Sequence, residues 1–158
     1  MENVRFGAFI DCSRNAVKTV DTVKNFAAAI KKAGYNALYL YLEDVYEIET
    51  EPYFGHLRGR YSVAELKELD DYCCSIGIEL IPAIQTLAHL GRLFTWEEYE
   101  NIHDIDYVML VGVEKTYELI DKMFAAMKKC FRSRSINIGM DEAYLMGRGR
   151  YMDINGIR

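Results

Sequence analysis

Two adjacent carboxylates near the end of the chain, Asp141 and Glu142, have the clearest chemical potential in the sequence. They follow residues 136–140, a short apolar run that is typical of a buried strand. In an α/β protein, ligands bind at the carboxyl ends of parallel strands, which is where this pair would lie. An aspartate after a strand can also cap the next helix, so the pair alone leaves both interpretations open.

Other apolar runs with the length and composition of strands precede this one, at residues 5–12, 37–42 and 79–84. Helical patterns separate the runs, at residues 17–33, 62–76 and 114–131. The alternation predicts an α/β fold with a parallel sheet and right-handed crossovers. Each predicted strand ends in polar side chains: Asp11 and Arg14, Glu43 and Asp44, His89, and Asp141 and Glu142. Capping alone does not explain so many polar ends at one edge, so the sequence favours an active site there.

The helical patterns carry start and stop signals. Ser62 and Glu65 have the spacing of a capping box, and Gly34 and Gly77 follow the first two helices as C-terminal glycines. The third helix is predicted to bury one stripe of side chains: Tyr117, Ile120, Phe124, Met127 and Phe131. Residues 45–61 predict a long polar loop, and a loop of that length is usually functional or flexible. Pro82 counts against a central position for its strand, because proline cannot donate to the ladder.

Composition excludes several classes of protein. A chain of 158 residues with 51% hydrophobic content can bury one good core. The net charge of −5 argues against a nucleic-acid binder and gives no attraction to anionic membranes. No apolar run is long enough to span a bilayer, and the N-terminus does not resemble a signal peptide. The four cysteines lack Cys-x-x-Cys spacing, so we expect reduced thiols and a cytoplasmic location.

Four motifs, in chain order, resemble those of glycoside hydrolase family 20, the β-N-acetylhexosaminidases. Residues 11–15, Asp-Cys-Ser-Arg-Asn, are similar to the Asp-x-x-Arg-His/Asn turn after the family's first barrel strand. Residues 36–44 resemble its second strand, which ends in an acidic residue. Residues 85–89 stand where the family has Thr-Pro-Gly-His, with Leu-Ala in place of Pro-Gly, and residues 139–142 resemble Gly-Gly-Asp-Glu. Residues 53–61 are similar to a segment of a divergent bacterial branch of exo-acting hexosaminidases.

The resemblance implies an activity, which is the hydrolysis of terminal β-linked N-acetylglucosamine or N-acetylgalactosamine with retention. The substrate's own acetamido carbonyl would attack the anomeric carbon and form an oxazolinium ion. Glu142 would be the general acid and base, a role that needs a raised pKa from the neighbouring carboxylate and partial burial. Asp141 would orient the acetamido group and stabilise the developing positive charge. Arg14 and Asp44 would bind sugar hydroxyls, and His89 would be a polar partner near the acid. No metal or other cofactor is implied.

The resemblance also implies the fold. The family's catalytic domain is a (β/α)8 TIM barrel, which typically needs ~250 residues. Residues 1–158 are therefore expected to be a partial catalytic domain, the first half of the barrel with about four strands. The missing half normally supplies an aromatic pocket around the acetamido methyl group and a tyrosine that positions the carbonyl. Half a barrel leaves open strand edges and an apolar inner face, so besides the glycan substrate we expect self-association or the missing half as a partner.

Three other interpretations remain open from the residues. A metal-assisted barrel hydrolase would use Glu43, Asp44, Asp141 and Glu142 as oxygen ligands for Mg²⁺, and its activity would depend on the metal. A non-catalytic doubly wound domain would bind a partner or a small ligand, although residues 11–15 contain no glycine with which to cradle a phosphate. An inert half-barrel would carry the right residues without turnover.

Overall fold

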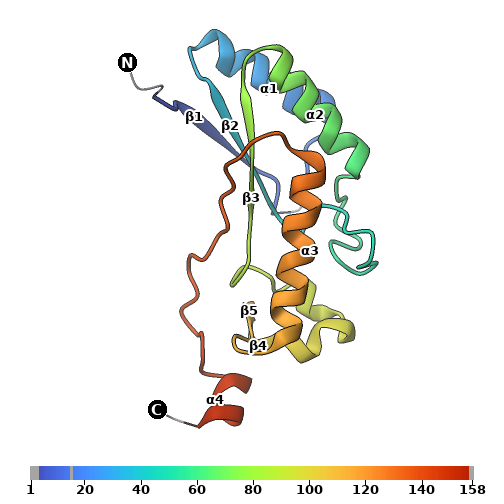
Figure 1. Ribbon diagram of the computed structural model, residues 1–158, viewed down its shortest axis with the longest axis vertical. Helices are drawn as coiled ribbons and strands as arrows, with labels where there is room; N and C mark the ends of the chain where they lie inside the picture. Colours follow the sequence, from blue (N-terminus) through green and yellow to red (C-terminus); the bar gives the residue numbers. More distant parts are fainter. Residues whose placement is uncertain (1–3, 15, 157–158) are drawn as a thin grey trace.

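The computed structural model describes residues 4–14 and 16–156, and its centre is a parallel three-stranded sheet. The strands are β1 (Gly7–Asp11), β2 (Ala37–Glu43) and β3 (Glu79–Ile84), in the spatial order β1-β2-β3. The helices α1 (Val20–Lys32), α2 (Val63–Ser75) and α3 (Glu114–Cys130) all lie on one side of this sheet (Figure 1). The predicted parallel β/α units are therefore confirmed.

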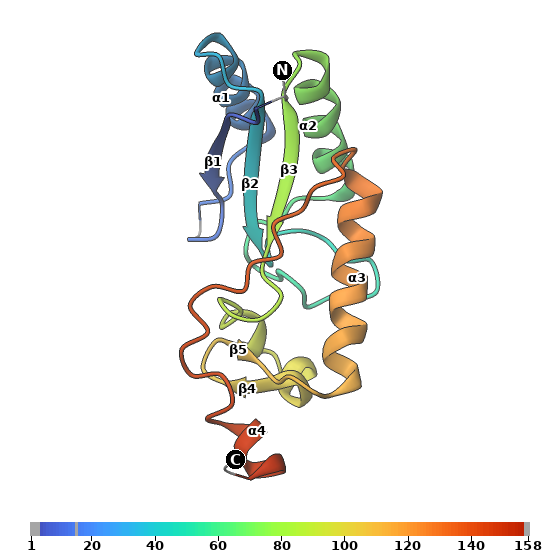
Figure 2. The same ribbon diagram turned by 60° about the vertical axis from the view of Figure 1, so that its left-hand side comes forward.

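The predicted fourth strand, at residues 136–140, does not form as a strand. Only Asn137 makes an isolated parallel bridge, with Ala83. Its N–H donates to the Pro82 carbonyl at 3.0 Å, and its carbonyl accepts from the Ile84 N–H at 2.9 Å. In one direction the ladder cannot continue, because Pro82 has no N–H. In the other direction the chain turns away at Gly139, which has a φ of 55°. The segment thus runs beside β3 as extended chain, which the colours from orange to red follow in Figure 2.

A smaller subdomain follows β3, at the lower end of the molecule in Figure 2. It contains two 3₁₀ turns, η1 (Leu93–Thr95) and η2 (Glu97–Ile102), and an antiparallel pair, β4 (His103–Ile105) and β5 (Val108–Met109). Elements this short have no hydrophobic periodicity of their own, so the sequence pattern does not predict them. The helix α4 (Arg150–Asn155) lies at the C-terminal end of the described chain.

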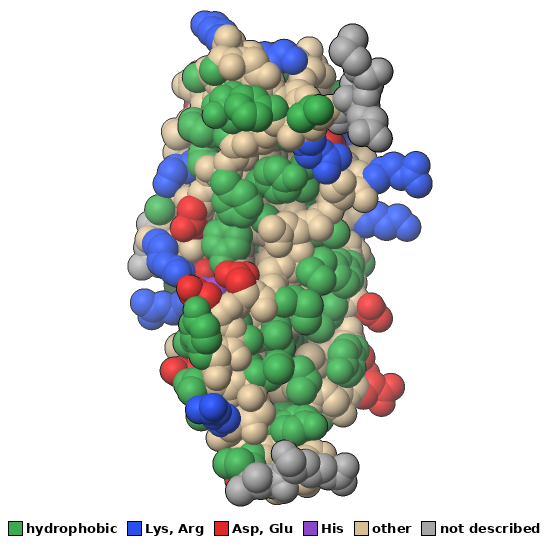
Figure 3. All heavy atoms as spheres, turned by 90° about the vertical axis from the view of Figure 1, so that its left-hand side faces the viewer, with side chains coloured by type: hydrophobic (Ala, Val, Ile, Leu, Met, Phe, Trp, Pro, Cys, Tyr) green, Lys and Arg blue, Asp and Glu red, His purple; other side chains and the backbone are tan. Residues whose placement is uncertain are grey.

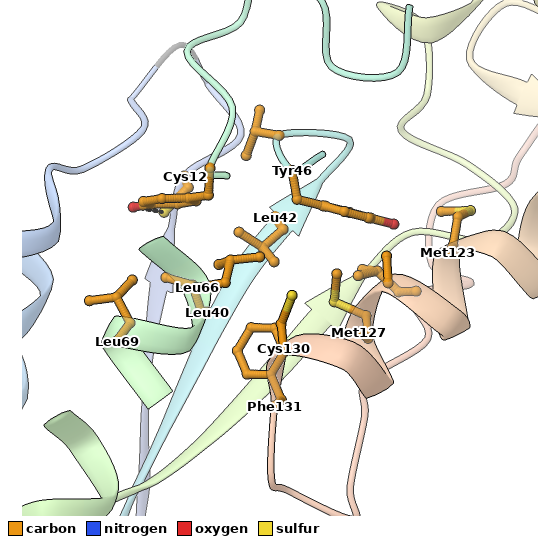
Figure 4. Close-up of a cluster of buried hydrophobic side chains, with 14 of the residues drawn as sticks. Cys12, Leu40, Leu42, Tyr46, Leu66, Leu69, Met123, Met127, Cys130 and Phe131 are labelled. Carbon is orange, nitrogen blue, oxygen red and sulfur yellow. Dashed lines mark hydrogen bonds between the residues drawn. The ribbon is translucent and has the colours of Figure 1, made fainter. Parts of the chain in front are cut away.

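The main core lies between the sheet and the three helices. Figure 4 shows the part where side chains of β2, α2 and α3 meet, with Leu40 and Leu42 near Leu66 and Met127. The predicted stripe of α3 is confirmed for Met127 and Phe131, which are buried, and Ile120 and Phe124 are partly buried against the core. It is wrong for Tyr117, which is 52% exposed, and the buried face also includes Thr116, Leu119, Met123, Ala126 and Cys130. Tyr117 instead places its hydroxyl near the Gly112 N–H, which donates to it at 3.3 Å.

The long loop between β2 and α2 is packed against this core. Its buried side chains are Val45, Tyr46, Ile48, Phe54 and Tyr61, and Tyr46 and Tyr61 form a parallel bridge. The sequence pattern shows mainly the polar residues between these anchors, so it does not reveal how firmly the loop is held. The packing matters for function because it fixes Arg58, which reaches the end of β2.

The opposite face of the sheet is open and apolar. Figure 3 shows this face, where hydrophobic side chains gather over much of the surface. The exposed large side chains include Phe9 of β1 at 52%, Ile138 at 41% and Met140 at 57%. Phe9 also stacks on Tyr39 of β2, with ring centroids 5.7 Å apart. In the part of the chain that the structure describes, no helix has both the length and the apolar character needed to cross a membrane.

Candidate active site

The predicted polar strand ends converge on one cleft. It has a volume of about 650 Å³, and its lining includes Arg14, Glu43, Arg58, His89, Tyr107 and Glu142. Arg14 and His89 follow β1 and β3, Glu43 ends β2, and Glu142 follows the chain beside β3. Arg58 comes from the loop between β2 and α2, and Tyr107 from the turn between β4 and β5. The cleft therefore lies at the carboxyl ends of the strands, where the fold places ligands.

His89 brings the two catalytic candidates together. Its Nε2 lies 3.3 Å from Asp141 Oδ2 and 3.5 Å from Glu142 Oε2, although neither contact has hydrogen-bond geometry, and Nε2 is left without a hydrogen-bond partner among the described residues. The imidazole stacks on the ring of Tyr107, with centroids 5.8 Å apart. Tyr107 in turn donates its hydroxyl proton to the Glu142 carbonyl at 3.1 Å. Tyr107 thus contacts both the His89 ring and the backbone of Glu142.

The backbone at these positions is unusual. His89 has a φ of 59° and Glu142 a φ of 55°, both in the left-handed region that non-glycine residues seldom adopt. Strained conformations of this kind persist where the surroundings hold them, and they cluster at functional sites. The side chains of Asp141 and Glu142 are 62% and 55% exposed. The partial burial expected for Glu142 is thus modest in this chain, whose sheet face is open.

Gln85 is a site residue that our sequence-based prediction missed. It is fully buried, and its Nε2 donates at 2.9 Å both to Asp141 Oδ1 and to the Tyr41 hydroxyl. The bond from Gln85 is the main reason that the pKa of Asp141 is lowered, with the nearby His89 adding to the effect. Asp141 is therefore held as a carboxylate. The residue stands four positions before His89 at a strand end, which is the signal that could have pointed to it.

Gly139 makes this arrangement sterically possible. With its φ of 55°, a Cβ at this position would lie 2.2 Å from the Ile84 carbonyl oxygen and 2.6 Å from Gln85 Oε1. No side chain fits there without moving the backbone of β3 or the glutamine. The glycine two positions before Asp141 therefore sets how closely the acidic pair approaches β3.

A second cluster of charges lies at the ends of β1 and β2. Arg14 contacts Glu43 at 3.0 Å, while Arg58 forms an ion pair with Asp44 and lies 3.7 Å from Glu43. Burial raises the pKa of Asp44 to about 6, although Arg58 opposes this shift. Tyr41 connects the cluster to Gln85 by donating to Glu43 at 3.2 Å. Arg58 lies within residues 53–61, which resemble a segment of bacterial hexosaminidases, but that resemblance suggested no role for it.

The structure separates the predicted site residues into two groups. Arg14, His89 and Glu142 line the cleft, and Asp141 contacts His89. Asp44 does not line the cleft, and its buried carboxylate pairs with Arg58. Its neighbour Glu43, for which the sequence suggested no role, lines the cleft instead.

Two further features of the first turn follow from the same geometry. Asp11 accepts hydrogen bonds at 2.7 Å from the N–H and hydroxyl of Ser13, which closes the turn after β1. Arg14 is consequently free of Asp11 and pairs with Glu43. Asn15, which belongs to the motif that resembles the family turn, lies outside the described residues.

The carboxylates do not form a metal centre of the kind considered above. Glu43 and Asp44 form one pair, and Asp141 and Glu142 form another, with Tyr41 and Gln85 between them. Across residues 4–14 and 16–156, no group of three or more His, Cys, Asp or Glu side chains is placed to hold a metal ion.

The fold and the cleft together define a partial (β/α) barrel with polar residues at the carboxyl ends of its strands. No protein-family model matches the chain. In sequence, the chain is 26% identical to Hexosaminidase D of Bos taurus over 125 residues, which cover 73% of this chain and 35% of that protein. The chain thus spans about a third of the length of this curated relative.

Solved structures show the same fold. A mutant Streptomyces plicatus β-hexosaminidase in complex with its product GlcNAc superimposes with a TM-score of 0.81 and 22% identity, covering 90% of this chain and 34% of that one. Flavobacterium johnsoniae chitobiase gives 0.80 and 21%, covering 95% and 25%. The glycoside hydrolase family 20 exo β-N-acetylglucosaminidase of Vibrio harveyi gives 0.79 and 19%, covering 98% and 31%. The chain is thus related to the family 20 β-hexosaminidases and matches part of their barrel.

Proposed function

We propose that this chain carries the acid/base portion of an active site that hydrolyses terminal β-linked N-acetylhexosamine. The observation that carries the proposal is the contact of His89 with both Asp141 and Glu142 beside an open cleft at the carboxyl ends of the strands. The relation to β-hexosaminidases supports the choice of substrate. Residues 1–158 would then be a partial catalytic domain.

The proposed roles follow from the chemistry of each group. Glu142 protonates the leaving oxygen and later activates water, while the substrate's acetamido oxygen attacks the anomeric carbon with retention. Asp141 is held as a carboxylate by Gln85, so it can accept the acetamido N–H and stabilise the cationic oxazolinium intermediate. His89 stands beside both carboxylates and would be a polar partner for them.

Sugar hydroxyls would be bound on the other side of the cleft. Arg14 is paired with Glu43 and its side chain is 69% exposed, so its remaining donors are open to a ligand. The geometry favours Glu43 over Asp44 for direct contact, because Glu43 lines the cleft. Asp44 would then act indirectly, by holding Arg58 in place through their ion pair.

The test is hydrolysis of nitrophenyl N-acetyl-β-glucosaminide and its galacto epimer by the chain. We expect turnover that Glu142→Gln abolishes and that a chelator leaves unchanged. Arg14→Lys is the matched variant, since it keeps the charge but loses the forked donor, and it should raise KM more than it lowers kcat. Loss of turnover with the chelator would favour the metal-assisted hydrolase. Equal turnover by Glu142→Gln would contradict the acid/base role of Glu142. No turnover by the parent chain would contradict the proposal that this chain is catalytic by itself.

A further inference from the structure

Tyr53, His56 and Trp96 form an aromatic cluster outside the cleft. The rings of Tyr53 and Trp96 are stacked with centroids 5.2 Å apart. The His56 ring meets both of them edge-on, at 5.1 Å from Trp96 and 6.0 Å from Tyr53. Tyr53 is 41% exposed, and His56 is exposed as well. Exposed aromatic rings that gather in one place often mark a binding surface.

Two members of this cluster, Tyr53 and Trp96, form one wall of a hollow of about 510 Å³. Tyr53 and Trp96 supply its apolar side, and the rest of the lining is polar: Glu97, Glu98, Asn101 and Lys115. All four polar side chains are exposed, so their donors and acceptors are available to a ligand. The hollow therefore combines flat apolar rings with acid, amide and ammonium groups around them.

This combination fits a neutral sugar ring. A pyranose presents an apolar C–H face, which can lie against an aromatic ring, and an edge of hydroxyls that both donate and accept hydrogen bonds. An anionic ligand would meet the carboxylates of Glu97 and Glu98. A wholly apolar ligand would strip water from those charged groups without replacing it.

The hollow is also placed close to the candidate active site along the chain. Thr95, the last residue of η1, lines the cleft, and Trp96, the next residue, lines the hollow. We propose that this hollow is a second carbohydrate-binding site, which holds neutral pyranose units of a glycan apart from the cleft at Glu142. The site is argued from the aromatic cluster, whereas the choice of N-acetylated sugars as the probe rests on the proposed function.

Trp96 is the only tryptophan of the chain, so its emission reports directly on the hollow. The experiment titrates N,N′,N″-triacetylchitotriose into the chain carrying Glu142→Gln, so that the sugar is not consumed, with excitation selective for tryptophan. We expect a saturable change in Trp96 emission. Tyr53→Ala should weaken the apparent affinity roughly 10-fold or more, as loss of an aromatic contact residue does. Tyr53→Phe keeps the ring and should retain most of the response, while circular dichroism checks that both variants fold.

The matched control is a change in the cleft. Arg14→Ala should leave the Trp96 response unchanged, since Arg14 does not line the hollow. Loss of the response in Arg14→Ala but not in Tyr53→Ala would overturn the second site, and so would the absence of any saturable change with the sugar. Binding at Trp96 without hydrolysis by the parent chain would refute the proposed function alone. Hydrolysis without a Trp96 response would refute only the second site.

Discussion

Gln85 shows how much of the site depends on a single buried side chain. It donates to both Asp141 and Tyr41, and it is the main cause of the lowered pKa of Asp141. In Gln85→Met we expect the pKa of Asp141 to rise toward its ordinary value, because the carboxylate loses its strongest donor. A carboxyl-carbon NMR titration measures this directly. Tyr41→Phe is the control, since it leaves the bond from Gln85 to Asp141 in place, and an unchanged titration in Gln85→Met would contradict this role.

Asp44 makes a prediction about pH. Burial raises its pKa in the folded chain to about 6 from an ordinary value of 3.8, against the opposing effect of Arg58. Between these two values the folded state binds more protons than the unfolded state, so stability falls as the pH rises from about 4 to about 6 and then levels off. Over that window the free energy of unfolding should fall by on the order of 3 kcal/mol.

Urea unfolding at pH 4 to 7 measures this slope. Asp44→Asn removes the titrating group, so its stability should depend much less on pH over the same range. Asp153→Asn, in the exposed last helix, is the control and should keep the slope of the parent chain. If Asp44→Asn and the parent gave parallel curves, the raised pKa of Asp44 would be wrong.

At the scale of elements, the sequence predicts the strands and helices that have a clear hydrophobic pattern. The three strands, the three long helices and the capping box of Ser62 and Glu65 are all present. The fourth strand is wrong because its apolar run does not reveal that its neighbour would be the segment containing Pro82, or that Gly139 turns the chain. The site is only partly predictable for a similar reason. Gln85 and Arg58 acquire their partners from distant segments, and no local pattern specifies those contacts.

Gly139 determines how the segment before the acidic pair lies on β3. Gly139→Ala would place a Cβ 2.2 Å from the Ile84 carbonyl oxygen, in addition to the cost of a positive φ. Gly34→Ala is a matched control, because Gly34 has a φ of 92° with open space around it. We expect Gly34→Ala to cost about 1 kcal/mol of stability and Gly139→Ala at least about 2 kcal/mol more. Urea unfolding measures both, and equal losses would show that the close approach at Gly139 is unimportant.

At the scale of the whole molecule, the sheet has one covered face and one open face. The helices cover one side, whereas hydrophobic side chains gather on the other side (Figure 3). The exposed large side chains include Phe9, Ile138 and Met140. In a closed barrel such residues would face the interior, and β1 would pair on both of its edges. Among residues 4–14 and 16–156, β1 pairs only with β2, so its second edge is open to another strand.

We therefore predict that the chain associates with itself through this face when no other part of a barrel covers it. Light scattering should show a mass that rises with protein concentration, because exposed apolar area and an unpaired edge both favour association. Phe9→Ser should shift the association to roughly 10-fold higher concentration, since it removes a large exposed ring from the open face of the sheet. Leu57→Ser is the control, because Leu57 is 85% exposed but lies in the loop between β2 and α2. A monodisperse monomer at all concentrations would refute the prediction, and an equal shift in both variants would place the contact elsewhere.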